Sequence, residues 1–364
     1  MSVSTQSIFG SPCKEENRRS ECRRGSRGFA PVYHPDTGIT GQERQLARVI
    51  DALGSVQRDR AVVVVAGPTA SGKSALALDL AHRFGGCVIN ADSMQVYREL
   101  RVVTARPTVE EEQSVPHSLY GVLGGDEVCS AARWADMAAQ DIARCREQGI
   151  LPVVTGGTGL YLRALVHGLS PIPDVPWDVR VQARALMDDI GNIAFHALLT
   201  ERDPVTAARL SVGDTQRQIR ALEVLEATGR SITAWQKEPP VPVVDADVLT
   251  IILDPARPWL YQRCDLRFVQ MLEQGACDEV QALDAMGLPA DALVLKALGV
   301  PELRALLHGV MSEEAAIDAA QQATRNFAKR QVTWFRHQLP ATLRLSGEDP
   351  RQWCEQAAGL LAGL

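Results

Sequence analysis

The sequence predicts an α/β protein: a P-loop NTPase-like parallel sheet flanked by helices, with a mainly helical inserted domain. Short apolar, β-branched segments alternate with segments of helical period, which is typical of a parallel sheet covered on both faces. The first apolar segment is followed by GPTASGKS at 67–74, which has the spacing of a phosphate-binding loop. Proline clusters at 170–178 and 237–247 enclose a helical stretch, which indicates an insertion between two stiff hinges.

The first elements follow from residue spacing. A polar helix is predicted near 42–56, and the β-branched run at 61–66 predicts a buried strand that ends at Gly-Pro. Apolar residues one helical turn apart predict a helix over 73–84. A second buried strand is predicted at 87–91, and a helix over 130–148.

The alternation continues along the chain. A third strand is predicted at 150–154, and the glycines after it lead into a helix from about residue 160. A strand at 248–253 returns the chain to the sheet, and helices are predicted from there to the end, the clearest over 313–338. The predicted domains are a disordered N-terminal extension, 1–58; a core, 59–170 and 244–364; and the insertion, 171–243.

The composition limits the function. The chain has 364 residues and a formal net charge of −6, so nucleic-acid binding would need a local positive patch. Its eight cysteines show no metal-ligand spacing, which predicts reduced thiols and no zinc site. Residues 1–40 lack the apolar core of a secretory signal, and no apolar run approaches the ~18 residues of a membrane span. These features predict a cytoplasmic protein without a membrane partner.

The phosphate-binding loop is the most specific local motif, because it lies between a predicted strand and a predicted helix. Gly67 and Gly72 would let backbone N–H groups turn inward, and the helix N-terminus would add its dipole. Lys73 supplies a positive charge, and Ser74 can hold Mg²⁺. The loop therefore predicts a site for phosphate groups.

A nucleotide hydrolase should also carry an apolar strand that ends in an acid. The strand at 150–154 ends in TGGTG instead, and the good match, IILD at 251–254, comes late in the chain. We interpret Asp254 as a turn residue that starts the following helix, which weakens an ATPase interpretation.

Asp92 follows the second predicted strand. Ligands of open α/β sheets bind outside the carboxyl ends of the strands, so Asp92, the phosphate-binding loop and the TGGTG turn at 155–159 should face one crevice. Asp92 can act there as a general base or help to bind metal, and it can equally cap a following helix. Thr158 either presents its hydroxyl to the ligand or caps the next helix.

Two helical segments carry polar faces. At 216–229 polar and apolar residues occupy separate faces, which is usual for a solvated helix. In the segment 324–336, Arg325, Lys329 and Arg336 form a rough stripe beside an apolar one. On an acidic protein this stripe predicts either a surface for an anionic ligand or a salt-bridged helix.

Seven segments, taken in order, carry a resemblance to a known family. They are GPTASGKS, ADSMQVY, TARPT (104–108), GGTGLYLRAL (156–165), QRQIRALEV (216–224), WLYQRCDLRFVQML (259–272) and ATRNFAKRQVTWFR (323–336). Together they resemble the tRNA dimethylallyltransferases, also called tRNA isopentenyltransferases, of the IPP transferase family. The P-loop is shared by many unrelated folds, whereas the DSMQVY, GGTGLY and KRQVTWFR segments at these distances are specific.

The resemblance implies that the loop holds the pyrophosphate of dimethylallyl diphosphate instead of ATP. Enzymes of this family transfer the dimethylallyl group to N6 of the adenosine 3′-adjacent to the anticodon in tRNA and release pyrophosphate. The implied cofactor is Mg²⁺ and the implied partner is the tRNA anticodon stem-loop, over which the insertion would close. We expect a monomer.

The resemblance also implies roles for single residues. Asp92 would be the general base that takes the proton from N6, Thr158 would hydrogen-bond near the reacting centre, and Ser74 would hold Mg²⁺. The expected diphosphate-binding residues are Gly67, Pro68, Thr69, Ala70, Ser71, Gly72, Lys73, Ser74 and Arg263. The expected tRNA contacts are Asp92, Ser93, Met94, Gln95, Thr158, Arg180, Gln216, Arg217, Gln218, Ile219, Arg220, Lys296, Lys329, Arg330, Gln331, Trp334 and Arg336.

Two other functions fit part of the pattern. A P-loop small-molecule kinase would use the loop, Lys73 and Asp92 equally well, but it would release ADP and leave the basic stripe without a role. A non-catalytic phosphate-binding module that docks RNA predicts that Asp92→Asn binds tRNA normally and changes no turnover. The departures from the family pattern at Val103 and Arg106 predict a local backbone change before Thr104.

Overall fold

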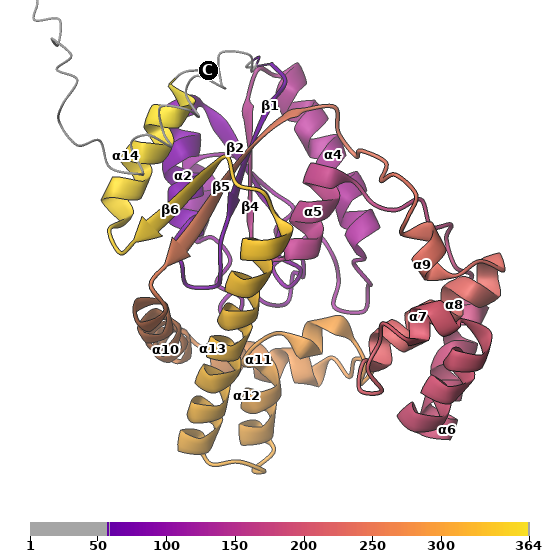
Figure 1. Cartoon of the computed structure of the whole chain (residues 1–364). Helices are drawn as coiled ribbons and strands as arrows, with labels where there is room; N and C mark the ends of the chain where they lie inside the picture. Colours follow the sequence, from indigo (N-terminus) through magenta and orange to yellow (C-terminus); the bar gives the residue numbers. More distant parts are fainter. Residues whose placement is uncertain (1–56, 58, 363–364) are drawn as a thin grey trace, which may run out of the picture. The chain divides into compact units, whose positions relative to one another are not determined.

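Six parallel strands form the centre of the computed structural model, in the order β3-β2-β4-β1-β5-β6 (Figure 1). In the central register, Val64 lies beside Val154 on one side and Thr250 on the other. The strands are β1 (Ala61–Ala66), β2 (Gly86–Asn90), β3 (His117–Ser118), β4 (Leu151–Gly156), β5 (Asp247–Pro255) and β6 (Leu343–Gly347).

The structure describes residue 57 and residues 59–362, which belong to one compact unit, Gly41–Leu364. The predicted helix near 42–56, and the predicted extension over 1–58 except for residue 57, lie outside the described residues. Within the described part of the chain, no helix is long and apolar enough to cross a membrane.

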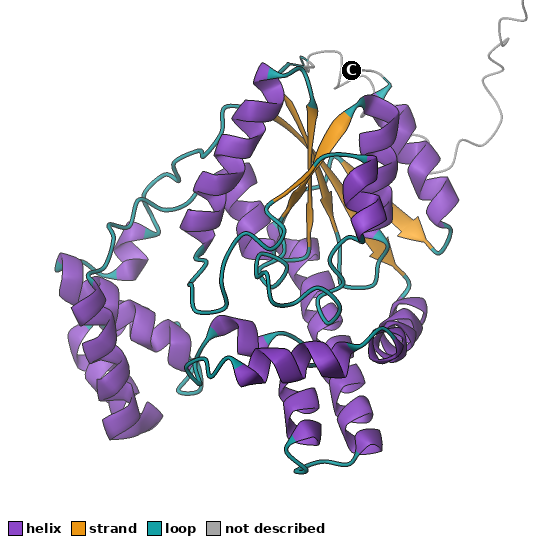
Figure 2. Ribbon diagram, turned by 180° about the vertical axis from the view of Figure 1, so that it is seen from behind, coloured by secondary structure: helices purple, strands orange, loops and turns teal. Residues whose placement is uncertain are grey.

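Helices cover both faces of the sheet (Figures 1 and 2), which explains why β1 is apolar along its whole length. Val62 lies in the larger core cluster with side chains of α4 and α5, and Val63 lies in the second cluster with side chains of α2 and α14. The helices are α2 (Lys73–Phe84), α3 (Val109–Ser114), α4 (Ala131–Glu147), α5 (Gly159–His167), α6 (Trp177–Arg202), α7 (Pro204–Ala207), α8 (Thr215–Thr228), α9 (Ile232–Trp235), α10 (Arg257–Glu273), α11 (Ala276–Ala285), α12 (Val300–Leu307), α13 (Glu313–Gln338) and α14 (Pro350–Leu361), with a 3₁₀ turn, η1 (Leu293–Lys296).

The predicted α/β class and parallel sheet are confirmed. β1, α2 and α13 begin and end at the predicted residues, and the other predicted strands differ from theirs by a few residues at the ends. The prediction of helices throughout the C-terminal part was wrong at β6, which pairs with β5. Leu343 and Leu345 are buried on either side of Arg344, and this alternation is too short to stand out in the sequence.

The segment between α5 and β5 packs largely on itself. Phe195 of α6 is fully buried against a cluster that includes Ile219 and Leu222 of α8. A second small cluster joins Leu199 of α6 to Ala207 of α7. These contacts favour the helical insertion that we predicted at 171–243, and its boundaries stay a prediction.

The two chain segments that lead into and out of these helices meet at one backbone contact. The N–H of Val241 donates to the carbonyl oxygen of Leu169 at 2.9 Å, in an antiparallel bridge. Gly168, with φ of +81°, allows this approach, because a Cβ there would lie 2.1 Å from the carbonyl oxygen of Val241. Gly168 is therefore required both by its backbone conformation and by the close approach of Val241.

We expect Gly168→Ala to lower the free energy of unfolding more than Gly149→Ala does. Both glycines have positive φ, so each substitution costs about 1–2 kcal/mol of backbone strain, but a Cβ on Gly149 has nothing within 4 Å. The clash at Gly168 adds to that strain. Thermal unfolding of the two variants measures the difference, and equal destabilisation would contradict the contact.

Candidate active site

The end of β2 holds Asp92 in a fixed position. The buried Asn90 side chain accepts the N–H of Asp92 (2.8 Å) and donates to the Asp92 carbonyl oxygen (3.0 Å). Asp92 Oδ1 accepts the N–H of Met94 at 2.9 Å and so closes a turn. No helix follows within the described loop, so the interpretation of Asp92 as a helix cap was wrong. Trp134 of α4 fixes Asn90 in turn, because its Nε1 donates to the Asn90 carbonyl oxygen at 2.8 Å.

The TGGTG turn brings the end of β4 against this loop. A Cβ on Gly156 would lie 2.1 Å from the carbonyl oxygen of Ala91, and the N–H of Thr158 donates to that same oxygen at 3.2 Å. Cβ atoms on Gly157 and Gly159 would lie 2.3 Å and 2.4 Å from side-chain atoms of α13. The glycines therefore let β2, β4 and α13 approach one another at a single point.

Thr158 uses its hydroxyl toward the Asp92 loop. Its Oγ1 accepts the N–H of Ser93 at 2.9 Å and lies 3.2 Å from the hydroxyl of Ser93. It occupies the N-cap position of α5, but its side chain makes no capping hydrogen bond. The hydroxyl therefore joins the two loops that follow β2 and β4.

The phosphate-binding loop has an inward-turning backbone at its tip. Ala70 and Gly72 have φ of +62° and +94°, and for alanine this conformation is strained and typical of functional sites. Gly72 precedes α2, whose first N–H groups have no partner within the helix and attract anions. Arg263 Nε donates to the Ala70 carbonyl oxygen at 3.0 Å, while its guanidinium stacks over Trp259.

Two half-buried cations face this loop. Lys73 Nζ lies 3.4 Å from the carbonyl oxygen of Pro68, and burial lowers the pKa of Lys73 to about 8, although the Asp92 carboxylate opposes this shift. Burial also lowers the pKa of Arg267 on α10. We did not predict Arg267 as a site residue, yet the sequence contained a signal: it follows Arg263 by one helical turn and so shares its face.

A cavity of about 280 Å³ lies beside the tip of the phosphate-binding loop, and Arg267 lines it, whereas Lys73 does not. Asp92, Arg267 and Thr69 contribute polar atoms to its wall. Ser93, Thr104, Lys296, Thr324 and Arg330 also line it, and the apolar part of the wall comes from Ala70, Met94, Val103, Cys264, Phe268, Met271, Ala297, Leu298 and Phe327. A charged end beside an apolar wall suits an amphiphilic ligand.

Gln331 of α13 ties the two sides of the site together. Its side chain is buried, Oε1 accepts the N–H of Thr69 at 2.8 Å, and Nε2 donates to the carbonyl oxygen of Gly157 at 2.8 Å. We expected Gln331 to contact tRNA, but both ends of its amide are occupied within the protein. It fixes the distance between the phosphate-binding loop and the TGGTG turn.

Other predicted tRNA contacts are also placed by the structure. Gln218 and Ile219 are buried, and Gln218 Nε2 donates to the carbonyl oxygens of Ser211 and Val212, so neither side chain is open to a partner in this conformation. Gln95 is internally bonded as well. Exposed side chains are those of Gln216, Arg217, Lys296, Lys329, Arg330 and Arg336; Ser93, Arg180, Arg220 and Trp334 are half-buried.

Of the expected tRNA contacts, Asp92, Ser93, Met94, Lys296 and Arg330 line the 280 Å³ cavity. The residues expected on α6 and α8 do not.

The basic stripe of α13 is partly paired. Arg325 forms an ion pair with Asp265 at 2.5 Å, and Arg336 lies 3.5 Å from Asp254. Asp254 also pairs with Arg344 at 3.4 Å. The interpretation of Asp254 as the residue that starts a helix was wrong, because it lies within β5 and Ala256 is the N-cap of α10.

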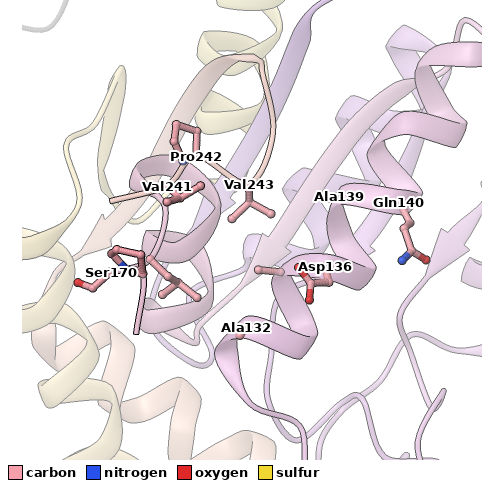
Figure 3. A pocket seen from close by; sticks show the side chains of 11 residues that line it. Ala132, Asp136, Ala139, Gln140, Ser170, Val241, Pro242 and Val243 are labelled. Carbon is pink, nitrogen blue, oxygen red and sulfur yellow. The ribbon is translucent and has the colours of Figure 1, made fainter. Parts of the chain in front are cut away.

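A second cavity, of about 550 Å³, lies between α4 and the two segments that flank the inserted helices (Figure 3). It is larger than the first but shares no residue with it. Asp136 is the ionisable residue in its wall, and the side chains opposite include Ser170, Val241 and Pro242. Without a phosphate-binding loop or a cation, it offers no comparable chemistry.

Comparison with known proteins decides the family. The sequence matches the IPP transferase family over residues 95–338, and the isopentenyl transferase family over residues 60–122. The chain belongs to the IPP transferase family. The resemblance inferred from the motifs is therefore confirmed.

Relatives in this family are similar along most of the chain. A tRNA dimethylallyltransferase of Paramagnetospirillum magneticum is 54% identical over 284 residues, which cover 78% of this chain and 90% of the relative. One of Rhodospirillum centenum is 55% identical over 291 residues, covering 80% and 93%.

Solved structures of the family have the same fold. A tRNA isopentenylpyrophosphate transferase of Bacillus halodurans is 33% identical with a TM-score of 0.60, covering 84% of this chain and 98% of that one. A eukaryotic dimethylallyltransferase acting on tRNA is 27% identical with a TM-score of 0.70, covering 82% and 77%.

The lowered pKa of Lys73 predicts that diphosphate binding weakens as pH rises through 8. The charged amine would attract the expected diphosphate, and between pH 7 and pH 9 its charged fraction in the free protein falls by about tenfold for a pKa of about 8. We expect the dissociation constant of dimethylallyl diphosphate to rise by a similar factor. In Lys73→Arg the charge persists, so the variant controls for titration of the diphosphate itself. An equal pH dependence in both proteins would refute the assignment.

Gln331→Leu should destabilise the site locally. It removes the partners of the Thr69 N–H and the Gly157 carbonyl oxygen, and each unpaired buried group costs about 1–3 kcal/mol. We expect a lower melting temperature and weaker diphosphate binding. Gln322→Leu, at an exposed position of α13, should change neither. Wild-type diphosphate affinity in Gln331→Leu would show that the bridge does not shape the loop.

Proposed function

We propose that the chain transfers a dimethylallyl group from dimethylallyl diphosphate to N6 of the adenosine 3′-adjacent to the anticodon in tRNA, with release of pyrophosphate. Family membership confirms the tRNA-prenylating activity; the roles of the residues are our proposal. The observation that supports these roles is the cavity whose wall brings Asp92 and Arg267 together with apolar side chains and with the tip of the phosphate-binding loop. An isoprenoid diphosphate has this combination of a charged head and an apolar tail.

The phosphate-binding loop would stabilise the leaving group. As the bond between allylic carbon and oxygen breaks, negative charge develops on the diphosphate. Lys73, the N-terminus of α2 and the two α10 arginines, Arg263 and Arg267, lie around the loop where this charge would form. Such preorganised positive groups act strongly where burial excludes water.

Ser74 fits the expected role in Mg²⁺ binding. It is the second residue of α2 and is exposed, so its hydroxyl oxygen, a ligand that Mg²⁺ accepts, is accessible next to the diphosphate site. We propose that Ser74 and oxygens of the diphosphate hold the ion, which would supply further positive charge to the leaving group.

Asp92 would take the proton from N6. One carboxylate oxygen is held by the N–H of Met94, and among the described residues the other has no hydrogen-bond partner. Thr158 holds the next residue, Ser93, because its hydroxyl oxygen accepts the N–H of Ser93. The new bond forms between N6 and the allylic carbon, the carbon–oxygen bond to diphosphate breaks, and the proton passes to Asp92.

The tRNA would supply an extruded adenine from its anticodon loop. Flipping a base costs on the order of a few kcal/mol, and least in an unpaired loop. Lys296 and Arg330 at the cavity, with Lys329 and Arg336 along α13, are the exposed cations that we propose for its phosphates. We propose Arg180, Gln216, Arg217 and Arg220 as contacts from the insertion.

We expect Asp92→Asn to lose transfer of labelled dimethylallyl to unmodified tRNA while it still binds tRNA. Removal of a general base lowers the rate by about 10²–10⁴-fold. Asp136→Asn, in the second cavity, should transfer normally. Full transfer by Asp92→Asn would contradict its role, and consumption of ATP without transfer by the wild type would favour a small-molecule kinase. RNA binding without any turnover would favour a docking module.

A further inference from the structure

Glu279 on α11 makes a concentrated set of contacts that the proposed chemistry does not use. Its carboxylate accepts hydrogen bonds from three consecutive N–H groups, those of Arg101 (2.5 Å), Val102 (2.8 Å) and Val103 (2.8 Å). These groups begin the turn over 101–105. An acid in this position pairs the donors that the start of a helical turn leaves free.

The other end of the same turn is held from the Asp92 loop. Gln95 Nε2 donates to the carbonyl oxygens of Thr104 (2.8 Å) and Ala105 (2.9 Å). Ala105 has φ of +49°, a conformation that an alanine keeps only when its surroundings fix it. The turn is thus held between a carboxylate at its start and an amide at its end.

This turn is part of the wall of the active site. Val103 and Thr104 line the cavity together with Asp92, whereas Glu279 does not line it. Gln95 lies three residues after Asp92, so a shift of the turn would be passed to the Asp92 loop through the two hydrogen bonds of Gln95. Any effect of Glu279 on the reaction must therefore act through the turn.

We propose that Glu279 is a positioning residue for the prenyl transfer, which holds the 101–105 turn so that Asp92 faces N6 of the adenine. The proposal rests on the proposed role of Asp92. Glu279 takes no part in the proton transfer itself. A misplacement of about 1 Å at a reacting group can cost about 10²-fold in rate. A residue outside the cavity can therefore change the rate if it shifts the turn and, with it, Asp92.

Glu279→Gln tests the proposal, because the amide has the size of the carboxylate but presents a donor to one of the three N–H groups. We expect kcat for label transfer to fall by about 10–100-fold with unchanged tRNA affinity. Amide hydrogen exchange at residues 101–103, measured by mass spectrometry, should become faster. The acidic limb of the pH–rate profile should keep its apparent pKa, because Asp92 remains the base. Asp278→Asn, at the neighbouring exposed acid of α11, should match the wild type in every measurement.

Wild-type kcat in Glu279→Gln, with faster exchange at 101–103, would overturn the proposal. Loss of the acidic limb, or an equal loss of rate in Asp278→Asn, would overturn it too. If Glu279→Gln does not fold, Glu279→Asp replaces it, because this variant keeps the charge but has a shorter side chain. We expect its kcat to lie below that of the wild type. A kcat equal to that of the wild type would again refute the proposal. Failure of the wild-type protein to transfer label would instead contradict the proposed function.

Discussion

The close contact between the ends of β2 and β4 is the constraint on which the candidate site depends. Because Gly156 has no side chain, the carbonyl oxygen of Ala91 can approach β4, and Thr158 then reaches the loop that carries Asp92. Gln331 extends the same contact to the phosphate-binding loop. Three loops at the carboxyl end of the sheet are thereby joined by buried hydrogen bonds, which are costly to leave unpaired. In the proposed reaction this framework would set the distance between the diphosphate and Asp92.

The positive charges of Lys73 and Arg267 are placed where they would bind an anionic ligand. Burial and the nearby charge of Arg267 lower the pKa of Lys73, burial and the nearby charge of Arg263 lower the pKa of Arg267, and the Asp92 carboxylate opposes both shifts. A diphosphate would relieve that repulsion, since an opposite charge favours the charged form of both groups. Part of the affinity for the donor would therefore come from charge neutralisation.

Much of the fold could be predicted because β1 is a continuous apolar run and α2 and α13 show a helical pattern in the sequence. β6 could not, since two buried leucines in a short segment carry little signal. For the site, the phosphate-binding loop was predicted from its motif, and Asp92 was predicted because the strand ends of a parallel sheet converge. Gln331, Gln218 and Glu279 show what could not be predicted, namely whether a polar side chain contacts a binding partner or bonds to the backbone. For Gln331 and Glu279 this depends on packing between segments more than a hundred residues apart. The backbone partners of Gln218 are local.

The most direct measurement is a crystal structure of the chain with an anticodon stem-loop and a thio analogue of dimethylallyl diphosphate that resists cleavage. The diphosphate should occupy the loop at 67–74, with the isoprenoid tail along Phe268 and Phe327. A carboxylate oxygen of Asp92 should lie within about 3.2 Å of the adenine N6. An empty loop, or an N6 that meets a different residue, would contradict the account.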